Sequence, residues 1–207
     1  MNKVMARYYS DLTEEQWYQV RYKQGFITKK PPFNLKGRKR NLLDVKEVLD
    51  SVGLKFWLTN GTSLAAYRER DWIPWDDDVD LDVMMEDYMK VRSELRERFI
   101  NEGFIVRDRH PDNTVLAKMA LFRDGEKTAL RPLYLDSSHK HGDKYRFRKD
   151  YKYPRKFYET SGTIEFMGET FNIPSPVEEW LTYVYKDWKT PVDEEIESIY
   201  STSDIRR

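Results

Sequence analysis

Cysteine is absent from the 207 residues, which excludes disulfide bonds and zinc sites that depend on cysteine ligands. The sequence also lacks a run of about 18 apolar residues that could span a bilayer, and residues 1–19 lack the apolar core of a signal peptide. Lysine plus arginine number 36, as do aspartate plus glutamate, so no net charge attracts nucleic acid or an anionic membrane. We therefore expect a soluble, cytoplasmic protein, in which any polyanion site depends on local clustering.

Aromatic residues are abundant, at 14% of the chain, and hydrophobic residues make up 39%. This composition is typical of a globular chain, because disordered chains are poor in aromatics. The length fits one domain with a single core. We predict an N-terminal arm and linker over residues 1–40, a domain over residues 41–191 and a tail over residues 192–207.

Helical and strand-like patterns of hydrophobic residues alternate along the predicted domain. Helices are predicted over residues 41–52, 64–69, 87–101 and 176–188, the last with a capping box that begins at Ser175 and with Pro176 as its first residue. Strands are predicted over residues 55–59, 78–84, 104–107, 115–123 and 130–136, and a hairpin joins 163–166 to 170–173. Residues 137–160 are expected to form a long irregular loop. This order predicts an α/β (α+β) fold with a small mixed β-sheet flanked by helices.

Aspartate recurs at every second position from Asp76 to Asp82. Side chains at positions i and i+2 share one face of a strand, so Asp78 and Asp80 should point the same way, about 7 Å apart. Carboxylates this close repel each other and raise each other's pKa. A divalent cation relieves the repulsion, and hard oxygen ligands suit Mg²⁺ or Mn²⁺, which often bind substrate phosphates as well. The run predicts a metal site for phosphoryl chemistry, with a solvated acidic edge or a calcium site as the alternatives.

A second motif, Asn60-Gly61-Thr62-Ser63, lies between a predicted strand and a predicted helix. Glycine lets a backbone approach a phosphate, and the N–H groups at a helix start can bind an anion. An ordinary strand-to-helix turn would have the same sequence. The acidic run follows about 15 residues later. The two motifs together are typical of nucleotidyltransferases, so the combination is more specific than the turn alone.

The segments Gly61–Glu69 and Asp71–Leu81 resemble the LicD/fukutin family, in which a Gly-Thr helix precedes Ile-Pro-Trp-Asp-Asp-Asp, a hydrophobic residue and Asp. The segment from Ile173 to Pro191 is similar too, so the resemblance covers roughly residues 40–191. It implies a nucleotidyltransferase fold. It also implies transfer of a phospho-substituent, such as phosphocholine or ribitol phosphate, from a CDP-linked donor to a hydroxyl of a glycan or related acceptor.

The resemblance implies roles for individual residues. Asp78 and Asp80 would form the metal pair, and Asp76 would assist them. Asp136 would be the third carboxylate, from a later strand, and the favoured general base. The residues expected to contact the donor are Gly61, Thr62, Ser63, Arg68 and Trp75.

The sequence departs from the family pattern at a few positions. Asp82 stands where a small residue is usual, and Ala65 and Arg70 replace common glycines. Polar residues 137–139 follow Asp136, where apolar residues are usual. Two other functions therefore stay open: transfer of NMP from an NTP, which would release pyrophosphate, and a catalytically inactive module that binds nucleotide or glycan.

Several side chains have two possible roles. Arg68 could clamp a phosphate or pair with a neighbouring acid. Trp72 and Trp75 could bind a quaternary ammonium group or pack the loop against the core. Residues 145–153 interleave basic and aromatic side chains, for which a solvated loop or a donor contact is favoured over nucleic-acid binding. The aromatic residues of the last helix are expected to pack.

Overall fold

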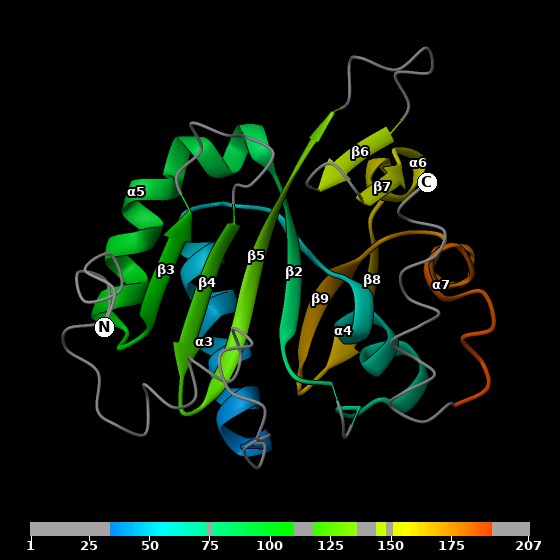
Figure 1. Cartoon of the computed structure of the whole chain (residues 1–207), viewed down its shortest axis with the longest axis horizontal. Helices are drawn as coiled ribbons and strands as arrows, with labels where there is room; N and C mark the ends of the chain where they lie inside the picture. Colours follow the sequence, from blue (N-terminus) through cyan, green and yellow to red (C-terminus); the bar gives the residue numbers. More distant parts are fainter. Residues whose placement is uncertain (1–33, 74–75, 110–117, 136–143, 148–150, 192–207) are drawn as a thin grey trace, which may run out of the picture.

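The computed structural model describes residues 34–73, 76–109, 118–135, 144–147 and 151–191. Its centre is a mixed sheet with the strand order β1-β2-β5-β4-β3 (Figure 1). Strands β2 and β5 are parallel, and the other neighbours in this order are antiparallel. The strand bounds are β1 Phe56–Leu58, β2 Val79–Met84, β3 Ile105–Arg109, β4 Lys118–Arg123 and β5 Glu126–Leu135. A mixed sheet with helices packed on it confirms the predicted fold class.

Further elements extend the structure beyond this sheet. Strand β6 (Lys144–Phe147) pairs with the end of β5 and with β7 (Tyr151–Pro154), and β8 (Gly162–Phe166) pairs with β9 (Glu169–Ile173). Helix α6 (Lys156–Glu159) and helix α7 (Val177–Tyr185) lie in the C-terminal part. Among the described residues, no helix is long and apolar enough to cross a membrane. The expected cytoplasmic location stays a prediction.

The two faces of the central sheet differ in chemistry. Helices α3 (Leu35–Ser51) and α5 (Met85–Asn101) pack against one face, and α3 lies behind the strands in Figure 1. On β2, this face carries Val79, Leu81 and Val83, all completely buried. Burial of a large aliphatic side chain stabilises a fold by about 1.5–3 kcal/mol. The apolar residues at every second position therefore hold β2 against the helices. The side chains between them point to the opposite face.

Helix α3 begins at Leu35, six residues before the predicted helix start at 41. The Asn34 side chain accepts a hydrogen bond from the Gly37 N–H at 2.9 Å, which caps the helix. Arg38 in the first turn is buried and pairs with Glu126 at 2.6 Å. The prediction of a linker over residues 29–40 is therefore wrong for residues 35–40, because contacts with a distant strand convert that segment into helix.

Other expectations also need correction. The turn predicted at residues 60–63 is helical: α4 spans Asn60–Leu64 and continues as a π-helix, η1, over Ala65–Glu69. The long loop predicted at 137–160 contains β6, β7 and α6. The capping box is wrong, because Pro176 is the N-cap of α7 and gives no side-chain cap. Strand β5 begins at Glu126, four residues before the predicted strand.

Candidate active site

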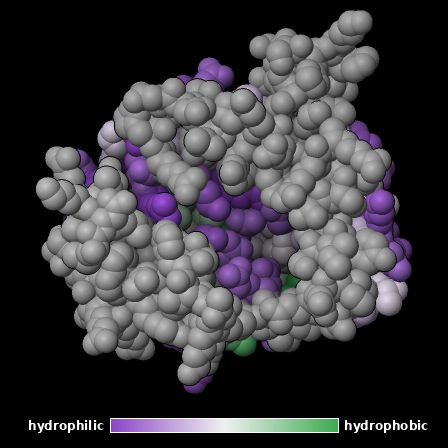
Figure 2. All heavy atoms as spheres, in the orientation of Figure 1, coloured by the Kyte–Doolittle hydropathy of each residue, from purple (hydrophilic) through white to green (hydrophobic). Residues whose placement is uncertain are grey.

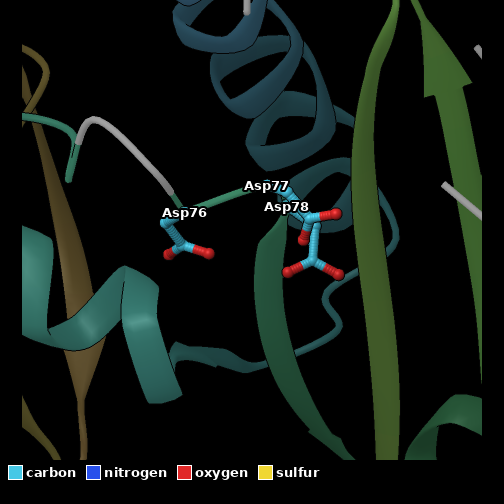
Figure 3. Close-up of side chains that lie close together, drawn as sticks. All are labelled: Asp76, Asp77 and Asp78. Carbon is cyan, nitrogen blue, oxygen red and sulfur yellow. The ribbon is translucent and has the colours of Figure 1, made fainter. Parts of the chain in front are cut away.

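Three acidic side chains converge where the chain enters β2. Each of Asp76, Asp77 and Asp78 offers a carboxylate oxygen, and these oxygens lie within 4.8 Å of one another. Figure 3 shows Asp76 on the coil near α4, and Asp77 and Asp78 together at the start of β2. Figure 2 shows that hydrophilic residues gather in the hollowed middle of this face, on the opposite side of the sheet from α3. Asp76 and Asp78, two of the predicted metal ligands, thus lie together with Asp77, for which no role is predicted from the sequence, and this group does not include Asp80.

A buried ion pair holds the backbone of this cluster. Arg38 Nη1 donates to the carbonyl oxygen of Asp76 at 2.8 Å, and Arg38 Nε donates to Glu126 Oε2 at 2.7 Å. The side chains of Arg38 and Glu126 are 1% and 2% exposed. Helix α3, the acidic coil and the first residue of β5 are therefore fixed to one another. Sequence reasoning missed both residues, since Arg38 was assigned to the linker.

Helix α4 is packed directly onto the acidic segment. A Cβ atom at Gly61 would collide with the Asp76 carboxylate, so only glycine allows this approach. The Thr62 hydroxyl accepts a hydrogen bond from the Asp80 N–H at 2.9 Å. The buried Ser63 hydroxyl donates to the Asn60 carbonyl at 2.7 Å. Gly61 thus lies against a carboxylate of the protein, its expected contact with a donor phosphate stays a prediction, and Thr62 and Ser63 use their hydroxyl groups within the protein.

Asp80 lies two residues after Asp78 and is held by two partners. Arg131 Nη1 is 3.1 Å from Asp80 Oδ2, and Asn60 Nδ2 donates to the same oxygen at 3.0 Å. Burial and the Asp78 charge raise the pKa of Asp80. Burial, followed by the Asp78 charge, raises the pKa of Asp76 to about 8. The predicted electrostatic conflict between neighbouring carboxylates is therefore present, and it extends from Asp76 to Asp80.

Asp82 is completely buried and belongs to a network with Arg131. Arg131 Nε lies 3.4 Å from Asp82 Oδ1, and the Tyr158 hydroxyl donates to Asp82 Oδ2 at 2.7 Å. Arg131 Nη2 also contacts the Tyr153 hydroxyl at 2.6 Å. Burial raises the pKa of Asp82, while Arg131 and the Tyr158 hydrogen bond oppose this rise. The departure from the family pattern at this position is thus accommodated by an arginine on β5 and by tyrosines of β7 and α6.

Two lysines complete the charged face. Lys127 forms an ion pair with Asp78. Although burial lowers the pKa of Lys127, the Asp78 and Asp80 charges raise it above its ordinary value. Burial and the charge of Lys127 lower the pKa of Lys118 to about 8. Sequence reasoning missed these lysines and Arg131, although Lys127 and Arg131 are four positions apart on one strand and so share one of its faces.

The remaining predicted residues have different surroundings. Arg68 pairs with Glu69 at 2.5 Å and donates to the Trp188 carbonyl at 3.0 Å. Trp72 packs edge-to-face on Phe166 with ring centroids 4.9 Å apart. The aromatic residues Trp180, Tyr185 and Trp188 are buried, as expected for packing. Residues predicted to act in the site that lie outside the described part of the chain are Asp136 and Trp75.

Comparison with known proteins places this arrangement in a family. Residues 53–176 match the family model described as LicD/FKTN/FKRP, nucleotidyltransferase domain. The chain belongs to this family. The predicted resemblance to LicD and fukutin proteins is confirmed, and the matched region contains α4, the acidic cluster, Lys118, Lys127 and Arg131.

Relatives in the LicD/FKTN/FKRP family include two human proteins. Ribitol 5-phosphate transferase FKRP of Homo sapiens is 28% identical over 166 residues, which cover 73% of this chain and 31% of that protein. Ribitol-5-phosphate transferase FKTN of Homo sapiens is 28% identical over 163 residues, covering 76% of this chain and 34% of the relative. The chain therefore spans about a third of the length of these relatives.

A solved structure supports the fold of this LicD-family chain. The solution structure of the antibiotic-resistance factor ANT(2'')-Ia superimposes with a TM-score of 0.50 at 18% sequence identity. The match covers 79% of this chain and 80% of that one. At this identity the similarity concerns the fold, which is that of a nucleotidyltransferase.

Proposed function

We propose that this LicD-family chain is a metal-dependent transferase. It moves a phospho-substituent, such as ribitol 5-phosphate or phosphocholine, from a CDP-linked donor to a hydroxyl of a glycan or related acceptor. The observation that carries the proposal is the convergence of Asp76, Asp77 and Asp78 beside Gly61. Arg38 holds this segment in place through a hydrogen bond to the Asp76 carbonyl oxygen. The names of the human relatives, both ribitol-phosphate transferases, support the choice of substituent.

The donor set suits a hard divalent cation. Carboxylate oxygens within 4.8 Å of one another provide the ligand type that Mg²⁺ and Mn²⁺ prefer. Burial first, and then the charge of Asp78, raise the pKa of Asp76 to about 8, and a bound cation would relieve the repulsion between these carboxylates. Asp76 and Asp78 belong to this set, and the family resemblance adds Asp80; these three are the residues we assign to the ion. When bound, such an ion neutralises charge on the departing phosphate group.

The other residues then have defined tasks. Arg131 and Asn60 hold the Asp80 carboxylate in one orientation, and Lys127 balances Asp78. In the transfer, the acceptor oxygen forms a bond to the phosphorus of the substituent, and the bond between that phosphorus and the CMP oxygen breaks. The proton of the acceptor hydroxyl moves to a carboxylate. Asp136 is our candidate for this base, on the resemblance to the family.

The proposal can be tested by ligand binding and product analysis. Thermal-shift measurements with CDP-ribitol, CDP-choline, CDP-glycerol and NTPs, each with and without Mg²⁺, should show stabilisation by one CDP-linked donor that depends on Mg²⁺. That donor and an acceptor should then release CMP. Release of pyrophosphate from an NTP would replace this proposal with nucleotidyl transfer. Stabilisation by nucleotide without turnover of any donor would favour the inactive binding module.

A further inference from the structure

The charged face continues beyond the acidic cluster in ordered rows across the sheet. Strand register places Asp80 beside Ala129, Ala129 beside Ala120, and Ala120 beside Arg107. Paired residues of neighbouring strands point to the same face. At about 4.8 Å per strand, this row spans about 14 Å from the carboxylate on β2 to the guanidinium-bearing residue on β3. Between them the row carries only two methyl groups.

Basic side chains surround Ala120 and Ala129 on this face of the sheet. Lys127 precedes Ala129 by two positions on β5, and Arg131 follows it by two. Lys118 precedes Ala120 by two positions on β4 and is paired with the backbone of β3 at residue 109. The side chains of Lys118, Lys127 and Arg131 therefore share the face of Ala120 and Ala129, which accords with the charges that act on Lys118.

These cations differ in how their charge is balanced. Lys127 is paired with Asp78, and Arg131 is paired with Asp80 and Asp82. The side chains of Lys118 and Arg107 make no hydrogen bond or ion pair with another residue in the described part of the chain. Burial and the neighbouring Lys127 lower the pKa of Lys118 to about 8, against the charges of Asp80 and Asp78, which raise it. The protein therefore disfavours the charged form of Lys118 relative to a lysine in water. An anion next to Lys118 would remove this cost.

We propose that Lys118 and Arg107 form a phosphate-binding subsite over Ala120 and Ala129, next to the acidic cluster. The subsite holds a phosphate group that is already on a substrate, either the diphosphate of the donor or a phosphate monoester on the acceptor. Lysine and arginine bind phosphate oxygens through charge-assisted hydrogen bonds, and Ala120 and Ala129 place no long side chain between the two cations. The assignment to a substrate rests on the transferase function proposed above.

Direct binding tests the subsite without turnover. Inorganic pyrophosphate is titrated by calorimetry in the absence of Mg²⁺, so that a metal ion cannot recruit the anion. Lys118→Met and Arg107→Met should each weaken binding about tenfold or more, as expected for loss of a hydrogen bond between ionised groups. Lys118→Arg should restore most of the affinity. Lys90→Met removes an exposed lysine from α5, which packs on the opposite face, and should leave binding unchanged.

Kinetics identify the source of the phosphate. If Lys118→Met raises KM for the CDP-linked donor alone, the subsite binds the donor diphosphate; a raised KM for a phosphorylated acceptor alone assigns it to the acceptor. Wild-type affinity for pyrophosphate in both Met variants, or no binding by the wild-type protein, would overturn the subsite. Loss of binding in these variants with no turnover of any donor would uphold the subsite and count against the transferase proposal.

Discussion

The two faces of strand β2 carry side chains of opposite chemistry, because apolar residues and aspartates alternate along the strand. One face carries Val79, Leu81 and Val83, which are fully buried against the helices. The other carries Asp80 and Asp82, whose pKa values burial raises. Apolar burial stabilises the fold without a specific partner, whereas a buried carboxylate is tolerated only with a cation and hydrogen bonds. One face therefore supplies stability, and the other uses part of that stability to hold the buried charges on which the proposed transfer depends.

The sharpest test of this division is neutralisation of a carboxylate at the cluster. Asp78→Asn should lower kcat by about a thousandfold or more, because the proposed metal ligand and a counter-charge for Lys127 are lost together. Relief of repulsion on Asp76 and Asp80 should keep the free energy of unfolding near the wild-type value. Turnover with the best CDP-linked donor and urea denaturation measure the two quantities.

The control for this variant is Asp50→Asn, which alters an exposed carboxylate at the end of α3. It should leave kcat within about twofold, as surface substitutions away from a site usually do. Near-normal turnover by Asp78→Asn would separate the acidic cluster from catalysis.

Removal of Arg131 should have the largest effect on stability. Arg131→Met leaves Asp80 and Asp82 without their shared cation, and breaking a buried pair in this way costs about 3–5 kcal/mol. The double variant Arg131→Met, Asp82→Leu should recover much of this loss, because an apolar pair replaces an unpaired charge. Its activity should stay low, since Asp80 still lacks its partner. Denaturant melts and kcat measure both effects.

If the double variant recovers activity as well as stability, Arg131 acts only as a structural counter-charge for Asp82. If it recovers neither, the Tyr153 and Tyr158 contacts of the network are the more important contribution.

A matched change on the apolar face should separate folding from function. Leu81→Ala removes a fully buried side chain and should lower the free energy of unfolding by about 2–5 kcal/mol, through lost transfer energy and a cavity. Well below its melting temperature the variant should keep kcat within about threefold, because Asp80 and Asp82 point the other way. A thousandfold loss of kcat in a folded Leu81→Ala protein would contradict the division between the faces.

The sequence alone predicted the parts of the fold that depend on local pattern. Alternation along residues 78–84 identified β2 and its charged face, and the hydrophobic stripe of residues 87–101 identified α5. Asp124-Gly125, a dipeptide typical of hairpin turns, joins β4 to β5. In each case the residues that determine the element lie close together in the chain, within one or two helical turns or a single hairpin. Local composition and spacing are therefore enough to predict it.

Elements that depend on distant partners were not predictable in this way. Leu35 to Arg40 reads as a linker after two prolines, yet it is helical because Arg38 reaches Glu126, 88 positions away. Arg131 is separated from Asp80 by 51 positions and was overlooked. The acidic cluster was found because its members are neighbours in the chain. The cations that balance it were missed because only the sheet register brings them there.

The smallest predicted effect concerns the start of α3, which anchors the acidic coil through Arg38. Asn34→Ala removes the side-chain cap on the Gly37 N–H and should lower the free energy of unfolding by about 1 kcal/mol. Asn34→Asp should retain the cap and most of the stability. Because Glu126 still holds Arg38, kcat should stay within about twofold. A larger drop in kcat for Asn34→Ala than for Leu81→Ala would mean that the helix start controls the acidic cluster more tightly than the core does.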